Sequence, residues 1–391
     1  MSHNRKSYRI FNMNMRRISR CYKTFNLQFM THKRLISYCL HPSHPHTVNP
    51  EPIKTSFIYP PLVRDTQSIR LLSPHLNQSG LSFDLQTYAA NDCPPYIALS
   101  YCWGTSSPPS IITVNNDSFV VSPNLADALH HVLDYLQCAQ STSNPANYLL
   151  WVDQICINQD DEAELANQVQ LMPQLFQASS LTIAWLGLID EHSDHALQLL
   201  ARKQRTTRKL TVPEKCILLK FDERPYWKRV WIMQEFILPP RLLIACGKTR
   251  VSWDSMRHAN SRNYSFCTHM APLFQRRNVM QYQNRKTHLA RLLTIVKGRG
   301  CTRPFDRIFA LLGLVVPGDL SGLRVDYAMP TQDFYHHVIG LLRRAARTKM
   351  EWDRGNKDLA EALEFPRPKH ALTPPLIDQE GPVETMEDAL D

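Results

Sequence analysis

Residues 148–187 decide the fold class, and they read YLLWVDQICINQDDEAELANQVQLMPQLFQASSLTIAWLG. The apolar runs at 148–153 and 181–186 are typical of buried strands. A helix is predicted between them from apolar residues at helical spacing, namely Leu165, Val169, Met172 and Phe176. A strand, a helix and a second strand in close succession favour a parallel sheet with helical crossovers.

The predicted helix has a clear start and an interruption. Asp160 and Asp161 precede it, and aspartate is a preferred residue at the amino-terminal cap of a helix. Pro173 lies inside it, where proline removes a backbone hydrogen bond and costs about 3 kcal/mol in an undisturbed helix. We therefore expect a kink or an early end at Pro173.

The same alternation of strands and helices extends toward the amino terminus. Residues 68–72 and 96–101 are predicted strands, and Trp103-Gly104 is a predicted turn after the second. Apolar residues at helical spacing predict a helix over 124–136. The fold class is therefore α/β, with a mainly parallel sheet flanked by helices. Neither a glycine-rich phosphate loop nor a Gly-x-Ser-x-Gly nucleophile elbow occurs in the chain.

Charge divides the 391 residues into a middle and two unlike ends. Residues 1–50 carry nine Lys or Arg and no acid, whereas residues 351–391 are rich in acids and proline. The sequence predicts a disordered basic arm over 1–55 and a disordered acidic tail over 351–391. The arm also fits a mitochondrial transit peptide or an upstream start, although a plain arm is favoured. The middle of the chain is only mildly basic and shows no basic stripe interleaved with aromatic residues, so nucleic-acid binding is not expected.

Cysteine usage and hydropathy limit the remaining classes. The ten Cys residues form no C-x-x-C pair and no zinc-like set with His, so no metal site is expected. This usage fits a reducing, cytoplasmic location. The longest apolar run, 308–316, is far shorter than the roughly 18 residues that a membrane-spanning helix needs. No membrane span is expected.

Three blocks are more specific than these patterns. They read YIALSYCWG at 96–104, LWVDQICINQ at 150–159 and RPYWKRVWIMQEF at 224–236. In order and separation they resemble the heterokaryon incompatibility (HET) domain of filamentous fungi. The resemblance spans roughly residues 66–340. For the domain organisation we expect a HET core at 66–240 and a mostly helical C-terminal part of the HET region at 241–350.

The resemblance implies a role in fungal non-self recognition and programmed cell death. It also implies self-association and an incompatibility partner protein. The HET family is distantly similar to Toll-receptor-type (TIR) domains, several of which cleave NAD. Two mechanisms follow from the resemblance: hydrolysis of NAD as a substrate, with no prosthetic group, or a non-catalytic self-associating module of the same pathway. Whether the chain is an enzyme stays open at this stage.

Glu235 is the candidate catalytic carboxylate. A mostly buried helix is predicted from Pro225 onward, and Glu235 shares one stripe of it with Trp227 and Trp231. The segment is similar to the one that holds the catalytic glutamate of TIR domains, where a carboxylate can stabilise an oxocarbenium-like transition state. The alternative is an ion pair with Arg229 or another arginine that only fixes the helix.

Asp153 is the second catalytic candidate because it ends a predicted buried strand, and ligands of parallel sheets gather at such strand ends. A turn-forming Asp is the alternative. Ser100, Tyr101 and Trp103 are candidate NAD-binding residues at the end of another strand, with core packing as the alternative. A pocket shared by Glu235 and Asp153 would favour an enzyme, whereas a Glu235 sealed against an arginine would favour the module.

Overall fold

The computed structural model describes residues 57–62, 67–75, 80–104, 108–138, 148–201, 210–256, 265–346 and 348–363. All of these ranges belong to one unit, residues 55–391. The predicted basic arm, and the part of the predicted acidic tail after residue 363, lie outside the described residues.

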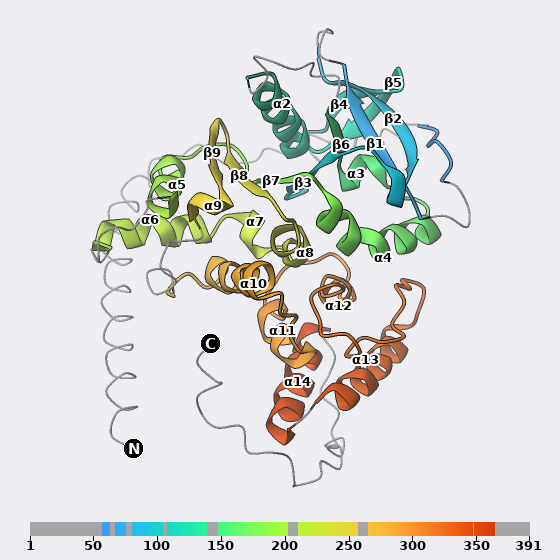
Figure 1. Ribbon diagram of the computed structural model, residues 1–391, viewed down its shortest axis with the longest axis vertical. Coiled ribbons are helices and arrows are strands. Elements are labelled where there is room, and N and C mark those ends of the chain that lie inside the picture. Colours follow the sequence, from blue (N-terminus) through green and yellow to red (C-terminus); the bar gives the residue numbers. More distant parts are fainter. Residues whose placement is uncertain are drawn as a thin grey trace, which may run out of the picture. The chain divides into compact units, whose positions relative to one another are not determined.

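One sheet of nine strands organises the described chain, in the order β5-β4-β2-β1-β6-β3-β7-β8-β9 (Figure 1). Four neighbouring strands, β6, β3, β7 and β8, form a parallel core. β2 and β4 also pair in parallel, whereas the pairings β1–β2, β1–β6, β4–β5 and β8–β9 are antiparallel. The strand bounds are β1 Ser68–Pro74, β2 Ser82–Ala89, β3 Tyr96–Tyr101, β4 Ser110–Val114, β5 Asp117–Val121, β6 Leu149–Trp151, β7 Leu181–Trp185, β8 Leu242–Cys246 and β9 Thr249–Ser252. The predicted α/β class, with a mainly parallel core flanked by helices, is confirmed.

The parallel core has a doubly wound order. Taken in chain order as strands 1 to 4, β3, β6, β7 and β8 lie in the spatial order 2-1-3-4. Successive connections from β3 therefore run in opposite directions across the sheet, which places a topological switch point between β3 and β7. In open α/β sheets, ligands bind beyond the carboxyl ends of the strands at such a point.

Helices cover both faces of this core. Ser100 of β3 pairs with Ala184 of β7, and the next residues pair as Tyr101 with Trp185, so each pair shares one face. Trp185 donates a hydrogen bond to Asn124 of α2 (Pro123–Cys138), so α2 covers the face of Tyr101. Ser100 contacts α8 (Ile232–Ile237) on the opposite face, where α4 (Glu162–Ala178) also packs.

Helix α4 starts as predicted but does not end early. The Asp161 side chain accepts hydrogen bonds from the backbone N–H groups of Ala163 and Glu164. The helix continues through Pro173 to Ala178, so the prediction of an early end there is wrong. Pro173 is buried, and its ring fills the space beside Gly313, where an added Cβ would lie 2.6 Å from the proline Cβ. Burial of the ring offsets the hydrogen bond that proline cannot make.

Two local predictions around the candidate residues are wrong. Strand β6 ends at Trp151, and Asp153 is the first residue of the short helix α3 (Asp153–Cys156). The helix expected from Pro225 is divided into α7 (Pro225–Lys228) and α8, because the backbone is extended at Arg229. Trp227, Trp231 and Glu235 therefore do not form one continuous helical stripe.

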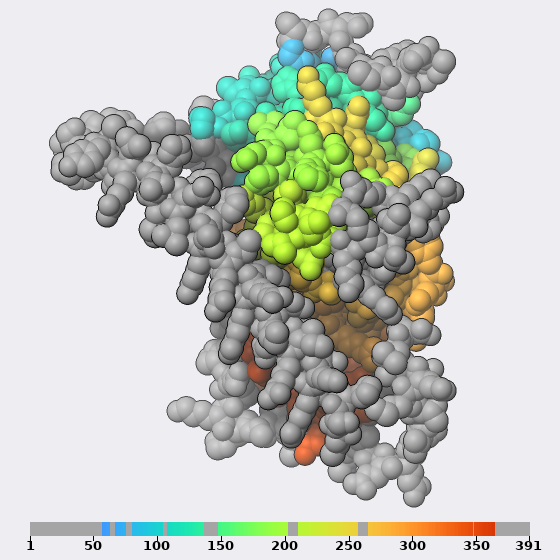
Figure 2. Space-filling model, turned by 90° about the vertical axis from the view of Figure 1, so that its left-hand side faces the viewer, coloured from blue at the N-terminus to red at the C-terminus, as the bar shows by residue number. Residues whose placement is uncertain are grey.

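The chain beyond β7 adds helices on one side of the sheet and below it in Figure 1. The remaining helices are η1 Ala90–Asp92, α5 Ser193–Ala201, α6 Val212–Asp222, α9 Trp253–Met256, α10 Met270–Gln283, α11 Leu289–Val296, α12 Asp306–Phe309, α13 Thr331–Ala345 and α14 Lys349–Ala362. Figure 2 shows α5 and α6 as one continuous light-green surface beside the yellow β8–β9 hairpin. None of the described helices combines the length and the hydrophobicity needed to cross a bilayer.

Helix α14 corrects the prediction of a disordered tail from residue 351. Trp352 and Leu359 are buried, and Asp358 accepts hydrogen bonds from Thr294 and Lys297, the residues in and just after α11. The acids of this stretch lie on a helix whose apolar face packs, so acidic composition alone was a misleading signal up to residue 362.

Candidate functional site

The candidate site lies at the switch point, where β3 ends and α8 crosses the sheet. β3 is buried along its whole length, and the alternation of its side chains points Ser100 toward α8. Glu235 lies on α8 and is only 2% exposed. The sheet and the helix therefore place a serine and a carboxylate against each other in the interior.

Glu235 is bound from two sides. The Ser100 hydroxyl donates its hydrogen bond to Glu235 Oε2 at 2.5 Å. Ser100 therefore accepts in its second hydrogen bond, which the Tyr226 hydroxyl donates at 2.9 Å. Arg229 donates hydrogen bonds to both carboxylate oxygens of Glu235, from Nη1 to Oε2 at 3.0 Å and from Nη2 to Oε1 at 3.4 Å. Such two-pronged pairing is the strongest geometry between arginine and a carboxylate. Glu235 is therefore sealed against an arginine.

Asp153 is a second carboxylate that interacts electrostatically with Arg229. Burial raises the pKa of Glu235, the attraction of Arg229 opposes this, and Asp153 raises it further. Burial also raises the pKa of Asp153, again opposed by Arg229. For Arg229, burial acts to lower the pKa, but Glu235 and Asp153 outweigh it and the pKa is raised. Two carboxylates thus interact with the same, mostly buried positive charge of Arg229, and the repulsion between them favours the protonated form of each.

Asp153 and Trp103 form the outer end of this group. Trp103 Nε1 donates to Asp153 Oδ2 at 2.8 Å, and the backbone N–H of Gln154 donates to Oδ1 at 2.7 Å. Tyr101 donates from its hydroxyl to the Gln154 side chain at 3.0 Å. Trp103 is 37% exposed, so the group reaches the surface here. The indole lies across the Asp153 carboxylate and is not free to stack on a ring in this conformation.

Asn124 holds the turn that carries Trp103. Its side chain donates to the carbonyl of Cys102 at 2.6 Å and accepts from Trp185 Nε1 at 3.0 Å. Gly104 has a φ of +69°, a backbone conformation that favours glycine. The turn predicted at Trp103-Gly104 therefore depends on a residue from the following helix.

The structure brings together Ser100 with Glu235 and Asp153 with Trp103, and both carboxylates interact electrostatically with Arg229. Tyr101 is linked to this group through Gln154. Sequence reasoning missed Tyr226 and Asn124. Tyr226 lies in the third block, and its position directly before Trp227 was a usable signal. Asn124 was assigned only to the start of a helix, and nothing local showed its bridge to Trp185.

Other chemistry is not supported in the described ranges. Burial raises the pKa of the Cys156 thiol to about 12, so this cysteine is not a thiolate nucleophile. No group of three or more His, Cys, Asp or Glu side chains there is arranged to hold a metal ion.

Comparison with known proteins bears on the three blocks. The family described as heterokaryon incompatibility protein (HET) matches residues 96–235, from the first residue of β3 to Glu235 itself. This stretch of the chain is therefore similar to the HET domain. The matched segment spans β3 to β7 and the start of α8, so it contains every residue of the network around Arg229.

A relative extends the similarity beyond the HET domain. Heterokaryon incompatibility protein 6, OR allele, from Neurospora crassa is 29% identical, over 62% of this chain and 46% of its own length. The match therefore spans less than half of that protein. No solved structure matches this chain. The resemblance to TIR domains stays a prediction.

Proposed function

We propose that this chain takes part in heterokaryon incompatibility as a non-catalytic signalling module, which passes on a death signal by self-association and by binding an incompatibility partner protein. The HET match and the named Neurospora relative support the process. One observation supports the mechanism: Glu235 is 2% exposed and both of its oxygens are engaged by Arg229. A carboxylate held in this way fixes the three blocks to one another and has no free oxygen to offer a substrate.

The test separates packing from chemistry at Glu235. Replacing a buried ion pair by apolar residues of similar size is often neutral for stability, so Arg229→Met/Glu235→Leu keeps the packing and removes the carboxylate. Wild type and this double variant are expressed from an inducible promoter in a filamentous fungus, and growth arrest is scored. Glu191→Gln, at a side chain that is 85% exposed, controls for loss of a carboxylate elsewhere.

A signalling module predicts growth arrest by wild type, by the double variant and by Glu191→Gln alike. Protein level and unfolding midpoint are measured in parallel, so that arrest is compared only between folded proteins. Loss of arrest in a double variant as abundant and stable as wild type contradicts the module and requires the carboxylate. If the double variant does not fold, Glu235→Gln provides the same comparison with a smaller change.

A second candidate function is NAD hydrolysis, and the outer end of the site favours it. Asp153 lies beyond the end of β6, next to β3, and bonds to the partly exposed Trp103; its pKa is raised by burial. In this proposal NAD binds over Trp103 after the indole releases Asp153. Tyr101 supports the site from one face of the sheet through Gln154, and Ser100 supports it from the other face through Glu235. Asp153 or Glu235 then stabilises the positive charge that develops on the ribose as the nicotinamide bond breaks.

NAD consumption by the purified chain, held at high concentration or fused to an oligomer, tests the second candidate. Asp153→Asn and Glu235→Gln are compared with wild type and with Glu191→Gln. Consumption by wild type and Glu191→Gln that disappears in Asp153→Asn or Glu235→Gln would establish the enzyme and overturn the module. No consumption by any folded protein rejects NAD hydrolysis.

A further inference from the structure

One stretch of the chain concentrates positive charge without acids. Residues 255–305 contain ten Lys or Arg and no Asp or Glu. Several of these charges have a structural use in the described part. Arg277 and Arg299 are buried and donate to backbone carbonyls of α8, α7 and the residue before α10, and Lys297 pairs with Asp358 and Glu361. Arginines without such a use call for another explanation.

Three arginines of this stretch have no carboxylate partner among the described residues: Arg276, Arg285 and Arg291. Arg276 lies on α10, Arg285 follows the end of that helix, and Arg291 lies on α11. Asn284 ends α10 with a φ of +50°, which turns the chain back so that Arg285 approaches the face of Arg276. The turn therefore gathers charges that the helices alone would separate.

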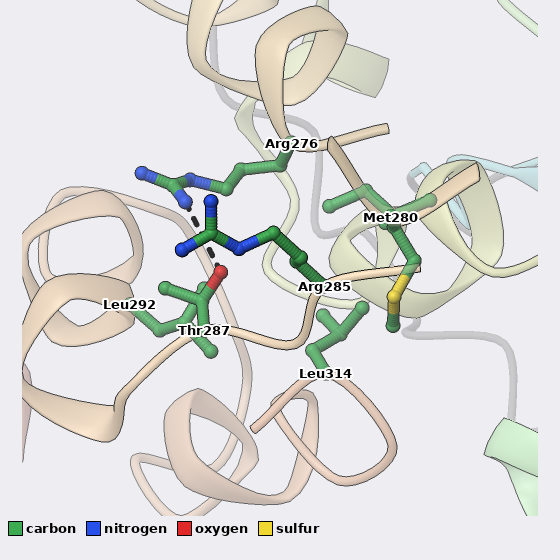
Figure 3. Close-up of a pocket in the computed structure, with 7 residues that line it drawn as sticks. Arg276, Met280, Arg285, Thr287, Leu292 and Leu314 are labelled. Carbon is green, nitrogen blue, oxygen red and sulfur yellow. Dashed lines mark hydrogen bonds between the residues drawn. The ribbon is translucent and has the colours of Figure 1, made fainter. Parts of the chain in front are cut away.

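Arg276 and Arg285 line one small pocket with Thr287 (Figure 3). Figure 3 shows both guanidinium groups turned toward the same space next to the Thr287 hydroxyl. Arg276 Nη1 donates to Thr287 Oγ1 at 3.1 Å, so the threonine keeps its own proton to donate elsewhere. Thr287 is held in place because its backbone N–H donates to Leu314 and its carbonyl accepts from Val316.

The positive charges of Arg276 and Arg291 repel one another. Burial lowers the pKa of the half-buried Arg276, and the positive charge of Arg291 lowers it further. Like charges gathered at a partly buried position cost stability unless an anion binds between them. The apolar lining of the pocket, which includes Ile237, Met280 and Leu314, lowers the local dielectric and would strengthen the attraction of an anion.

We propose that Arg276, Arg285 and Thr287, supported by Arg291, bind a phosphate group. A phosphate dianion matches the charge, and its oxygens match the paired N–H donors of arginine. The pocket volume is about 10 Å³, close to the space for the centre of one water-sized group. The pocket would admit one phosphate oxygen, which would accept a hydrogen bond from the Thr287 hydroxyl. Arg285, at the exposed mouth of the pocket, would donate hydrogen bonds to the other phosphate oxygens. The phosphate belongs either to the free ion or to a small phosphomonoester.

The test measures phosphate binding by the full chain. Calorimetric titration and unfolding midpoints are recorded with sodium phosphate and with sodium chloride at equal ionic strength. Arg276→Gln/Arg285→Gln is compared with wild type, and Lys248→Gln, an exposed residue in the turn between β8 and β9, is the control for lost charge. Charge-assisted hydrogen bonds imply that the double variant binds phosphate at least about tenfold more weakly, while the control binds like wild type.

The sources of the phosphate are distinguished by repeating the titration with glucose 6-phosphate. Tighter binding than orthophosphate identifies a phosphomonoester, and equal binding identifies the free ion; either supports the site. Binding no stronger than that of chloride, or equal binding by all three proteins, overturns it.

The unfolding midpoints of the same variants also test whether the arginines repel one another. Without phosphate, Arg276→Gln/Arg285→Gln is expected to unfold at or above the wild-type midpoint, because like charges have been removed. A lower midpoint would mean that the arginines only support the fold. If the double variant does not fold, Arg291→Gln, at an exposed position, takes its place in the titration, with a weaker but measurable loss of phosphate affinity expected.

Discussion

Removing Arg229 while keeping Glu235 should destabilise the fold in a way that depends on pH. In Arg229→Met the Glu235 carboxylate stays buried without its partner, and it can escape the cost of burial only by binding a proton. Protonating a carboxyl with an ordinary pKa of 4.5 costs about 3.4 kcal/mol at pH 7 and about 0.8 kcal/mol at pH 5. These figures are ceilings, because the pKa of Glu235 is already raised in the wild type.

The expected result is therefore a loss of up to about 3 kcal/mol of unfolding free energy at pH 7, shrinking to about 1 kcal/mol or less at pH 5. The sign follows from the raised pKa: the folded variant holds its proton to higher pH than the unfolded chain, so its stability falls as pH rises above about 4.5. Urea unfolding, followed by tryptophan fluorescence at both pH values, measures the difference.

Arg229→Met/Glu235→Gln is the matched control. It has no carboxyl at 235 to protonate, so its stability relative to wild type should change much less between pH 5 and pH 7. An equal loss at both pH values in Arg229→Met would mean that only packing was lost, and it would refute the electrostatic account. So would a double variant with the same pH dependence as the single one.

Two further predictions concern the hydrogen bond between Asn124 and Trp185 and the packing of Pro173 against Gly313. Asn124→Ala removes the acceptor of the fully buried Trp185 indole, and a loss of about 1–3 kcal/mol in urea unfolding is expected; a loss below about 0.5 kcal/mol would show that this bridge is unimportant. Gly313→Ala and Gly318→Ala both strain a positive φ, but only the first also forces a Cβ against Pro173. Gly313→Ala should lower the unfolding midpoint clearly more than Gly318→Ala, and equal midpoints would contradict the packing of α4 described above.

The strands of the parallel core were predictable because buried strands consist of short apolar runs that can be recognised in the sequence. β3 and β7 appear almost as expected from residues 96–101 and 181–186. The cap of α4 at Asp161 was also predictable, since capping depends on one side chain and the next three residues. These features are local, and local sequence is sufficient for them.

The break between α7 and α8 could not be predicted because its cause lies far along the chain. Gly300 pairs with Arg229: its N–H donates to Lys228, and its carbonyl accepts from Val230. The side chain of Arg299 also donates to the carbonyl of Trp227. This pairing pulls the backbone at Arg229 out of the helix, and it brings the guanidinium to Glu235.

The candidate site was predicted in part for the same reason. Ser100 lies near the end of β3, and Trp103 and Asp153 lie just beyond the ends of β3 and β6, which are neighbours in the sheet, so their proximity follows from the fold class. Glu235 was selected from a resemblance, and the sequence left its ion pair with Arg229 as one of two alternatives. Only the tertiary structure decides between an open and a sealed carboxylate, because exposure depends on residues distant in sequence.

The central claim is that Glu235 is sealed, and carboxyl labelling measures this directly. The folded chain is treated with a water-soluble carbodiimide and glycine ethyl ester, and the labelled residues are identified by mass spectrometry. Glu191, at 85% exposure, provides the internal standard for an open carboxylate. We predict rapid labelling of Glu191 and none of Glu235 until the protein is unfolded. Labelling of Glu235 in the folded protein at a rate near that of Glu191 would contradict the account.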